Sequence, residues 1–195
     1  MSRGLTLCLL AALPLVAPVE VATVSLAKLV EGSAAIVVGT VDSVTNVEGV
    51  SVAHVKVTEV VKGDPKVERL AFVAQSTWRC DISTAVRGET ALLFLADLPD
   101  GVSSWTEGRN WKTWGQSLGK EPGYLLAHSG RGRMPVHEGS SDRHVQVCGD
   151  IVEATTWLAP CETCAYRYRR PLPEMLADVR RILEEQAKAA APPPK

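Results

Sequence analysis

Residues 34–44 read AAIVVGTVDSV, a run of small and β-branched residues. β-Branched side chains pack well on a pleated sheet, so the run predicts a strand, and Gly39 indicates a bulge or close packing within it. A turn follows at 46–49. In residues 50–61, apolar Ala53, Val55 and Val57 alternate with polar residues. That alternation predicts a second strand with one buried face and one solvent-facing one.

Further strands are indicated downstream by short apolar or alternating runs between turn residues. The run TALLFLA at 90–96 is continuously apolar, which predicts a fully buried strand. The segment at 100–122 has no clear period, and we expect a long, partly ordered loop there. The remaining predicted strands are 67–74, 124–128, 134–137 and 143–147.

Two helices are expected, one at each end of the domain. Residues 25–32 (SLAKLVEG) place Ser25 as an N-cap and Gly32 as a stop. At the other end, apolar residues recur at helical spacing and predict an amphipathic helix that docks on the sheet. Residues 187–195 are expected to form a disordered tail. The apolar stripe consists of Leu172, Met175, Leu176, Val179, Ile182 and Leu183.

The order of these motifs resembles a bacterial secreted domain of the netrin/TIMP-like type. The resemblance rests on AAIVVGTVDSV at 34–44, VKVTEVVKG at 55–63 and GETALLFL at 88–95. It covers residues 26–98, with 124–135 as a returning strand. It implies a mainly β fold, a small OB-like Greek-key β-barrel with a short N-terminal helix and a C-terminal amphipathic helix. Inhibitors of that family insert an N-terminal Cys at a protease metal. This chain has none near its expected mature start, so the activity is not carried over.

The N-terminus has the features of a signal peptide. Arg3 precedes an apolar run, LTLCLLAALPLV at 5–16, which is too short to span a bilayer. We expect residues 1–22 to be removed, a domain at 23–186, and a secreted or periplasmic protein without a membrane anchor after cleavage. A retained anchor helix is the alternative. The net charge of −1 gives no indication of a nucleic-acid partner.

Four cysteines remain after the leader: Cys80, Cys148, Cys161 and Cys164. In an exported protein an even number predicts two disulfides. We favour Cys80–Cys148 with Cys161–Cys164, and a crossed pairing between Cys80, Cys148 and the CETC pair stays open. A redox-active CxxC is a further alternative, as is zinc bound by Cys148, Cys161 and Cys164 with Cys80 or His144. With disulfides as the favoured interpretation, no cofactor and no metal site are expected.

Three tryptophans in the polar segment at 100–122 form the candidate binding surface: Trp105, Trp111 and Trp114. They either bind a partner or pack together over one end of the barrel. Residues 115–119 (GQSLG) match the G-x-S-x-G pattern around Ser117, but the flanking sequence lacks the strand and helix that a nucleophile elbow needs. The YRYRR segment at 166–170 is interpreted as an edge strand rather than a nucleic-acid strip.

The sequence therefore predicts an exported, non-enzymatic binding or interaction module stabilised by disulfides. Its partner would be a protein or a glycan, with the oligomeric state left open. The alternative is an exported enzyme, either a thiol-disulfide oxidoreductase using Cys161 and Cys164 or a Ser hydrolase using Ser117.

Overall fold

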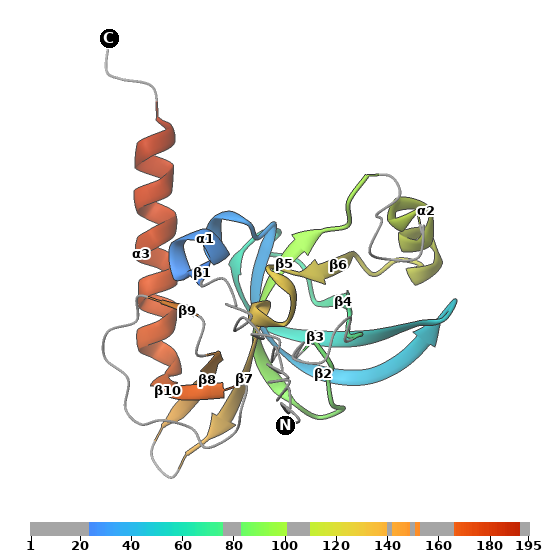
Figure 1. Ribbon diagram of the computed structural model, residues 1–195, viewed down its shortest axis with the longest axis horizontal. Coiled ribbons are helices and arrows are strands. Elements are labelled where there is room, and N and C mark those ends of the chain that lie inside the picture. The colour runs from blue at the N-terminus through green and yellow to red at the C-terminus, as the bar shows by residue number, and fades with distance from the viewer. Residues whose placement is uncertain are drawn as a thin grey trace, which may run out of the picture.

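The computed structural model describes residues 24–75, 83–100, 110–139, 142–148, 151–152 and 166–191. Strands dominate it, with one long helix at the C-terminal end (Figure 1). The elements are β1 (Val24–Ser25), α1 (Leu26–Glu31), β2 (Ala35–Val47), β3 (Val50–Lys62), β4 (Arg69–Val73), β5 (Thr90–Asp97), α2 (Trp111–Gly115), η1 (Gln116–Leu118), β6 (Gly123–Leu126), η2 (Ser129–Gly132), β7 (Arg133–Glu138), β8 (Arg143–Cys148), β9 (Ile151–Val152), β10 (Tyr166–Pro171) and α3 (Leu172–Ala190).

Eight strands form one sheet in the order β10-β8-β7-β5-β2-β3-β4-β6, and β5 also pairs with β6. That extra pairing closes a ring through β5, β2, β3, β4 and β6. The pairing of β4 with β6 is parallel, and the other pairings of this sheet are antiparallel. Beyond the ring, β7, β8 and β10 continue the sheet from β5, and β10 is an edge strand as the sequence predicts.

The β2–β3 hairpin is the longest pairing and projects away from α3 (Figure 1). The predicted role of Gly39 is confirmed. The register of β2 with β3 shifts between Val38 and Gly39, which marks a bulge. A Cβ at Gly39 would lie 2.5 Å from Val55 Cγ1 and 2.8 Å from the Lys56 carbonyl oxygen. Only glycine fits at this close approach of the two strands.

The interior has two main parts. One lies inside the ring and includes Val37, Phe72 and Leu93. The other lies between the sheet and the helices, where the predicted stripe of α3 is buried from Leu172 to Ile182 and contacts α1 and β8.

The predicted N-cap of α1 is also confirmed, because the Ser25 hydroxyl accepts from the Lys28 N–H at 3.1 Å.

Two segments differ from the sequence prediction. Part of the predicted loop at 100–122 is helical, because Asn110 caps α2 by accepting from the Thr113 N–H at 3.1 Å. The predicted tail at 187–195 is also wrong at its start. The helix α3 continues to Ala190, since alanine, lysine and glutamine are all good helix formers.

Several predictions fall outside the described residues. These are the signal peptide at 1–22, Cys80, Cys161, Cys164, Trp105 and the tail at 192–195. The backbone of Cys148 ends β8, but its side chain is not described. Within the described part of the chain, no helix is long and apolar enough to cross a membrane.

Candidate functional site

A cluster of polar side chains lies on the outer side of the ring, across β2, β3 and β4. It consists of Asp42 and Thr45 from β2, His54 from β3, Arg69 from β4, and Glu121 from the segment before β6. We call these five residues the His54 cluster. They come from four separate stretches of sequence, so only the closed ring brings them together.

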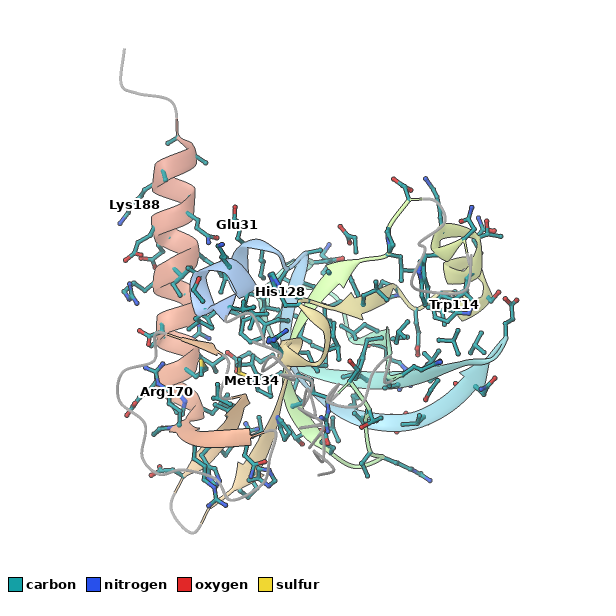
Figure 2. The ribbon with its side chains drawn as sticks, in the orientation of Figure 1. Glu31, Trp114, His128, Met134, Arg170 and Lys188 are labelled. Carbon is teal, nitrogen blue, oxygen red and sulfur yellow. The ribbon has the colours of Figure 1, made fainter. Side chains whose placement is uncertain are left out.

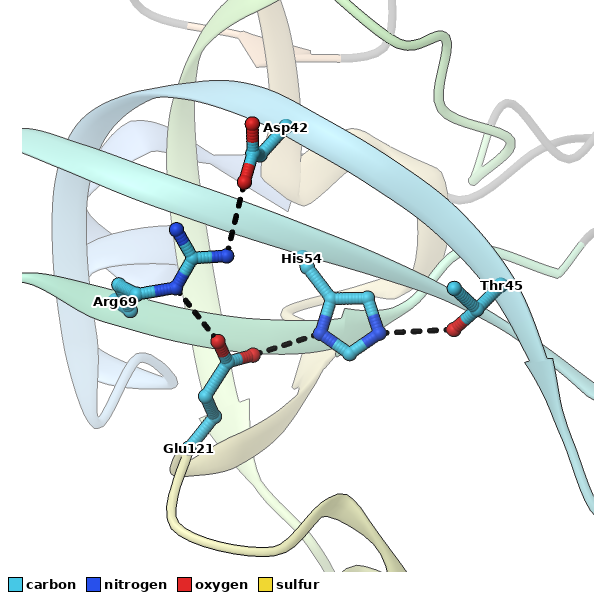
Figure 3. Close-up of polar contacts among 5 residues, drawn as sticks. All are labelled: Asp42, Thr45, His54, Arg69 and Glu121. Carbon is cyan, nitrogen blue, oxygen red and sulfur yellow. Dashed lines mark hydrogen bonds and ion pairs between the residues drawn. The ribbon is translucent and has the colours of Figure 1, made fainter.

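The cluster is a continuous chain of hydrogen bonds (Figure 3). His54 Nε2 lies 2.8 Å from Thr45 Oγ1, and His54 Nδ1 lies 2.7 Å from Glu121 Oε2. The Arg69 guanidinium donates through Nε to Glu121 Oε1 at 2.7 Å and through Nη2 to Asp42 Oδ2 at 3.0 Å. The Glu121 carboxylate therefore lies between one imidazole and one guanidinium.

Strand geometry explains why these side chains face outward. In β3, Ala53 and Val55 are buried while His54 between them is only half-buried, which agrees with the predicted alternation. The Ala71 N–H of β4 donates to the Pro122 carbonyl at 2.9 Å, which anchors the chain beside β4. This bond fixes Glu121 opposite His54 and Arg69.

The pKa of the Glu121 carboxyl is lowered from its ordinary value of 4.5. Burial is the largest single influence and acts to raise the pKa, since it disfavours the charged form. Hydrogen bonds from Arg69 and His54, with the attraction of their charges, together outweigh burial. The cluster therefore holds Glu121 as a carboxylate, the form that accepts from both neighbours.

This shift predicts an acid-sensitive contribution to stability. A carboxyl whose pKa is lower in the folded state stabilises the fold above its unfolded pKa, and this stability is lost as the pH falls through the folded value. We expect Tm to fall from pH 5.5 to pH 3, and to fall less steeply in Glu121→Gln. The pKa of Asp178 is lowered too, so only the difference between the curves reports on Glu121. Thermal melts of Glu184→Gln, an exposed carboxylate of α3, should follow the wild-type slope; equal slopes for both variants would contradict the prediction.

A shallow hollow of about 190 Å³ adjoins the cluster at Asp42. Its lining includes Thr40 of β2, Lys56 of β3 and the turn at Arg87 and Gly88. Lys56 and Arg87 are both exposed, and neither has an ion-pair partner among the described residues. The hollow therefore adds two cations to a surface that already carries donors and acceptors.

Two of the three predicted surface tryptophans are buried. Trp111 and Trp114 of α2 pack edge to face, with ring centroids 5.0 Å apart, against Val50 and Val52. The Trp114 Nε1–H donates to the Val47 carbonyl at 3.1 Å. For these two residues the structure agrees with the packing alternative. They attach the segment before β6 to the side chains of Val50 and Val52 on β3, and Figure 2 shows Trp114 near the β2–β3 hairpin.

The remaining predicted site residues are not brought together with the cluster. Ser117 lies on η1, and its hydroxyl donates to Glu48 Oε1 at 2.9 Å rather than to a histidine. Among the described residues, no group of three or more His, Cys, Asp or Glu side chains could hold a metal ion. The side chains of the four cysteines predicted to form disulfides lie outside the described part of the chain.

The sequence alone does not single out His54 as a site residue. The alternation of residues 50–61 indicates that its side chain faces outward. No local signal gives its partner, because Glu121 is 67 positions away along the chain.

Comparison with known proteins adds no family. No protein-family model matches the chain, and no curated protein matches its sequence.

Proposed function

We propose that this protein is an exported, non-enzymatic binding module on an OB-like barrel, and that its ligand contacts the outer side of β3 and β4. The signal-peptide pattern at 1–22 supports export. The strand order supports the barrel, because β5-β2-β3-β4 has the fourth–first–second–third order of a Greek key. The pairing of β6 with both β4 and β5 then closes the ring.

The observation that carries the proposal is the position of the His54 cluster. OB-folds bind oligosaccharides and other extended ligands on the face of their second and third strands, bordered by the loops after the first and fourth. In the ring, those strands are β3 and β4, and the loop after the fourth strand is the segment at 98–122. His54, Arg69 and Glu121 belong to these three parts. The cluster therefore lies where a ligand of such a barrel would bind.

The chemistry of the face suits a polar ligand such as a glycan or a polar protein surface. The carboxylates of this face accept hydrogen bonds from hydroxyl groups. Arg69, Lys56 and Arg87 donate hydrogen bonds. Because Trp111 and Trp114 are buried, they would act as the scaffold of this surface and not as its contact residues.

An array of immobilised oligosaccharides tests the proposal with Arg69→Gln and a matched control. The control residue is Arg181 of α3, which pairs with two carboxylates as Arg69 does. The side chain of Arg181 is 57% exposed and that of Arg69 is 45% exposed. We expect Arg69→Gln to weaken binding by about tenfold or more, since a hydrogen bond from a charged group contributes about 1.5–3 kcal/mol. Arg181→Gln should bind as the wild type does.

Two results would count against a binding module for glycans. An array without any bound oligosaccharide would exclude the tested glycans and favour a protein ligand. Covalent labelling of Ser117 or Thr45 by a fluorophosphonate probe would favour the enzymatic alternative. Thr45 is included because its hydroxyl, His54 and Glu121 follow the nucleophile–base–carboxylate order of hydrolases. Free thiols in the native protein would favour the alternative of a redox enzyme that uses Cys161 and Cys164.

A further inference from the structure

Two histidines face each other on the part of the sheet outside the ring. His137 of β7 is directly opposite His144 of β8 in the antiparallel register. Their rings are stacked, with centroids 5.7 Å apart and planes inclined by 24°. His137 is exposed and His144 is half-buried, so solvent reaches the pair.

Among the described residues, nothing occupies the nitrogens of either ring. In the part of the chain that the structure describes, neither ring makes a hydrogen bond or an ion pair. His54 is different, since both its nitrogens have partners within the His54 cluster. An imidazole with a free nitrogen is the most common protein ligand for transition metals.

The hairpin holds the two rings in place. Their inward neighbours Val136 and Val145 are buried in the core, and the Gly139 N–H donates to the Asp142 carbonyl at 2.8 Å next to the turn. A Cβ at Gly139 would lie 2.5 Å from the Asp142 carbonyl oxygen, so glycine allows this close approach next to His144. A rigid pair of strands therefore presents two imidazoles to one region of solvent.

We propose that His137 and His144 bind a divalent transition-metal ion, Cu²⁺ more tightly than Zn²⁺. Imidazole suits both ions, and the Irving–Williams order places Cu²⁺ first for a given set of nitrogen ligands. At a metal–nitrogen distance of about 2.0–2.1 Å, two ligand nitrogens in tetrahedral geometry lie about 3.4 Å apart. Rotation of the two side chains about their χ angles would bring one nitrogen of each ring to that separation. Two protein ligands leave coordination positions open for water or for a donor from a second molecule.

Isothermal titration calorimetry of the full chain with Cu²⁺ tests this site. We expect one ion per chain, weaker binding of Zn²⁺, and at least about a tenfold loss of Cu²⁺ affinity in either His137→Ala or His144→Ala. The matched control is His128→Asn, because asparagine tolerates the left-handed backbone of residue 128, where φ is 48°. That variant should keep the wild-type affinity.

Electron paramagnetic resonance of the Cu²⁺ complex gives a second measurement. The wild-type spectrum should show nitrogen couplings from both imidazoles, and each alanine variant should show one fewer. Unchanged affinity and spectrum in His137→Ala would overturn the proposal. If His137→Ala changes nothing but Cu²⁺ affinity is lost in His144→Ala and after alkylation of the cysteines, the site is instead built from cysteines and His144. Circular dichroism of each variant ensures that any loss is not due to unfolding.

Discussion

Replacing Trp114 with alanine should lower the free energy of unfolding by about 3–5 kcal/mol, the usual cost of truncating a buried aromatic side chain to alanine. The Trp114 side chain is 2% exposed, and its ring contacts Trp111 at 5.0 Å between centroids. The loss would leave a cavity between Trp111 and the buried side chains of Val50 and Val52. Urea unfolding followed by far-UV circular dichroism measures the change without relying on tryptophan fluorescence.

Trp114→Phe separates the two contributions of this residue. Phenylalanine keeps most of the apolar volume but lacks the Nε1–H that donates to the Val47 carbonyl. Because this hydrogen bond is partly buried, its loss should cost about 1 kcal/mol. An alanine variant with wild-type stability and impaired ligand binding would show that Trp114 is a contact residue of the candidate surface instead.

The sequence predicts well those elements whose apolar pattern continues over many residues or whose ends are marked by capping or turn residues. Residues 50–61 alternate over a full strand, 90–96 form an unbroken apolar run, and 172–183 carry six apolar residues at helical spacing. The short helix α2 is not predicted, because five residues hold too little periodicity to stand out from a loop. Its signals are Asn110 as an N-cap and two tryptophans three positions apart.

The candidate site is harder to predict than the fold, because its contacts depend on ring closure. The parallel pairing of β4 with β6 places Glu121 beside Arg69, which is 52 positions away along the chain. The local pattern around Glu121 does not indicate which strands lie next to it in the sheet. For the same reason the pattern of the tryptophans could not decide between a surface and a core: the answer depends on which strand α2 covers.

Replacing Glu89 with alanine should lower the free energy of unfolding by about 3–5 kcal/mol, the usual cost of removing one partner from a buried ion pair. Arg133 donates through Nε to Glu89 Oε1 at 2.7 Å, and its Nη2 donates to Oε2, so the pair is bidentate. The Arg133 side chain is 8% exposed and that of Glu89 is 15% exposed. Removal of the carboxylate takes the bidentate Glu89 contact away from a largely buried guanidinium, so the desolvation of Arg133 is offset less well.

The exposed pair of Glu138 and Arg143 is the matched control for this prediction. Their side chains are 77% and 41% exposed, and the two groups lie 3.1 Å apart. Glu138→Ala should cost less than about 1 kcal/mol, because solvent screens such pairs. The double variant Glu89→Leu with Arg133→Met should recover most of the stability lost in Glu89→Ala, since a buried ion pair replaced by apolar side chains of similar size is often neutral in its effect. Equal unfolding midpoints for Glu89→Ala and Glu138→Ala in urea would show that water compensates Arg133, and that β5 and β7 do not depend on this pair.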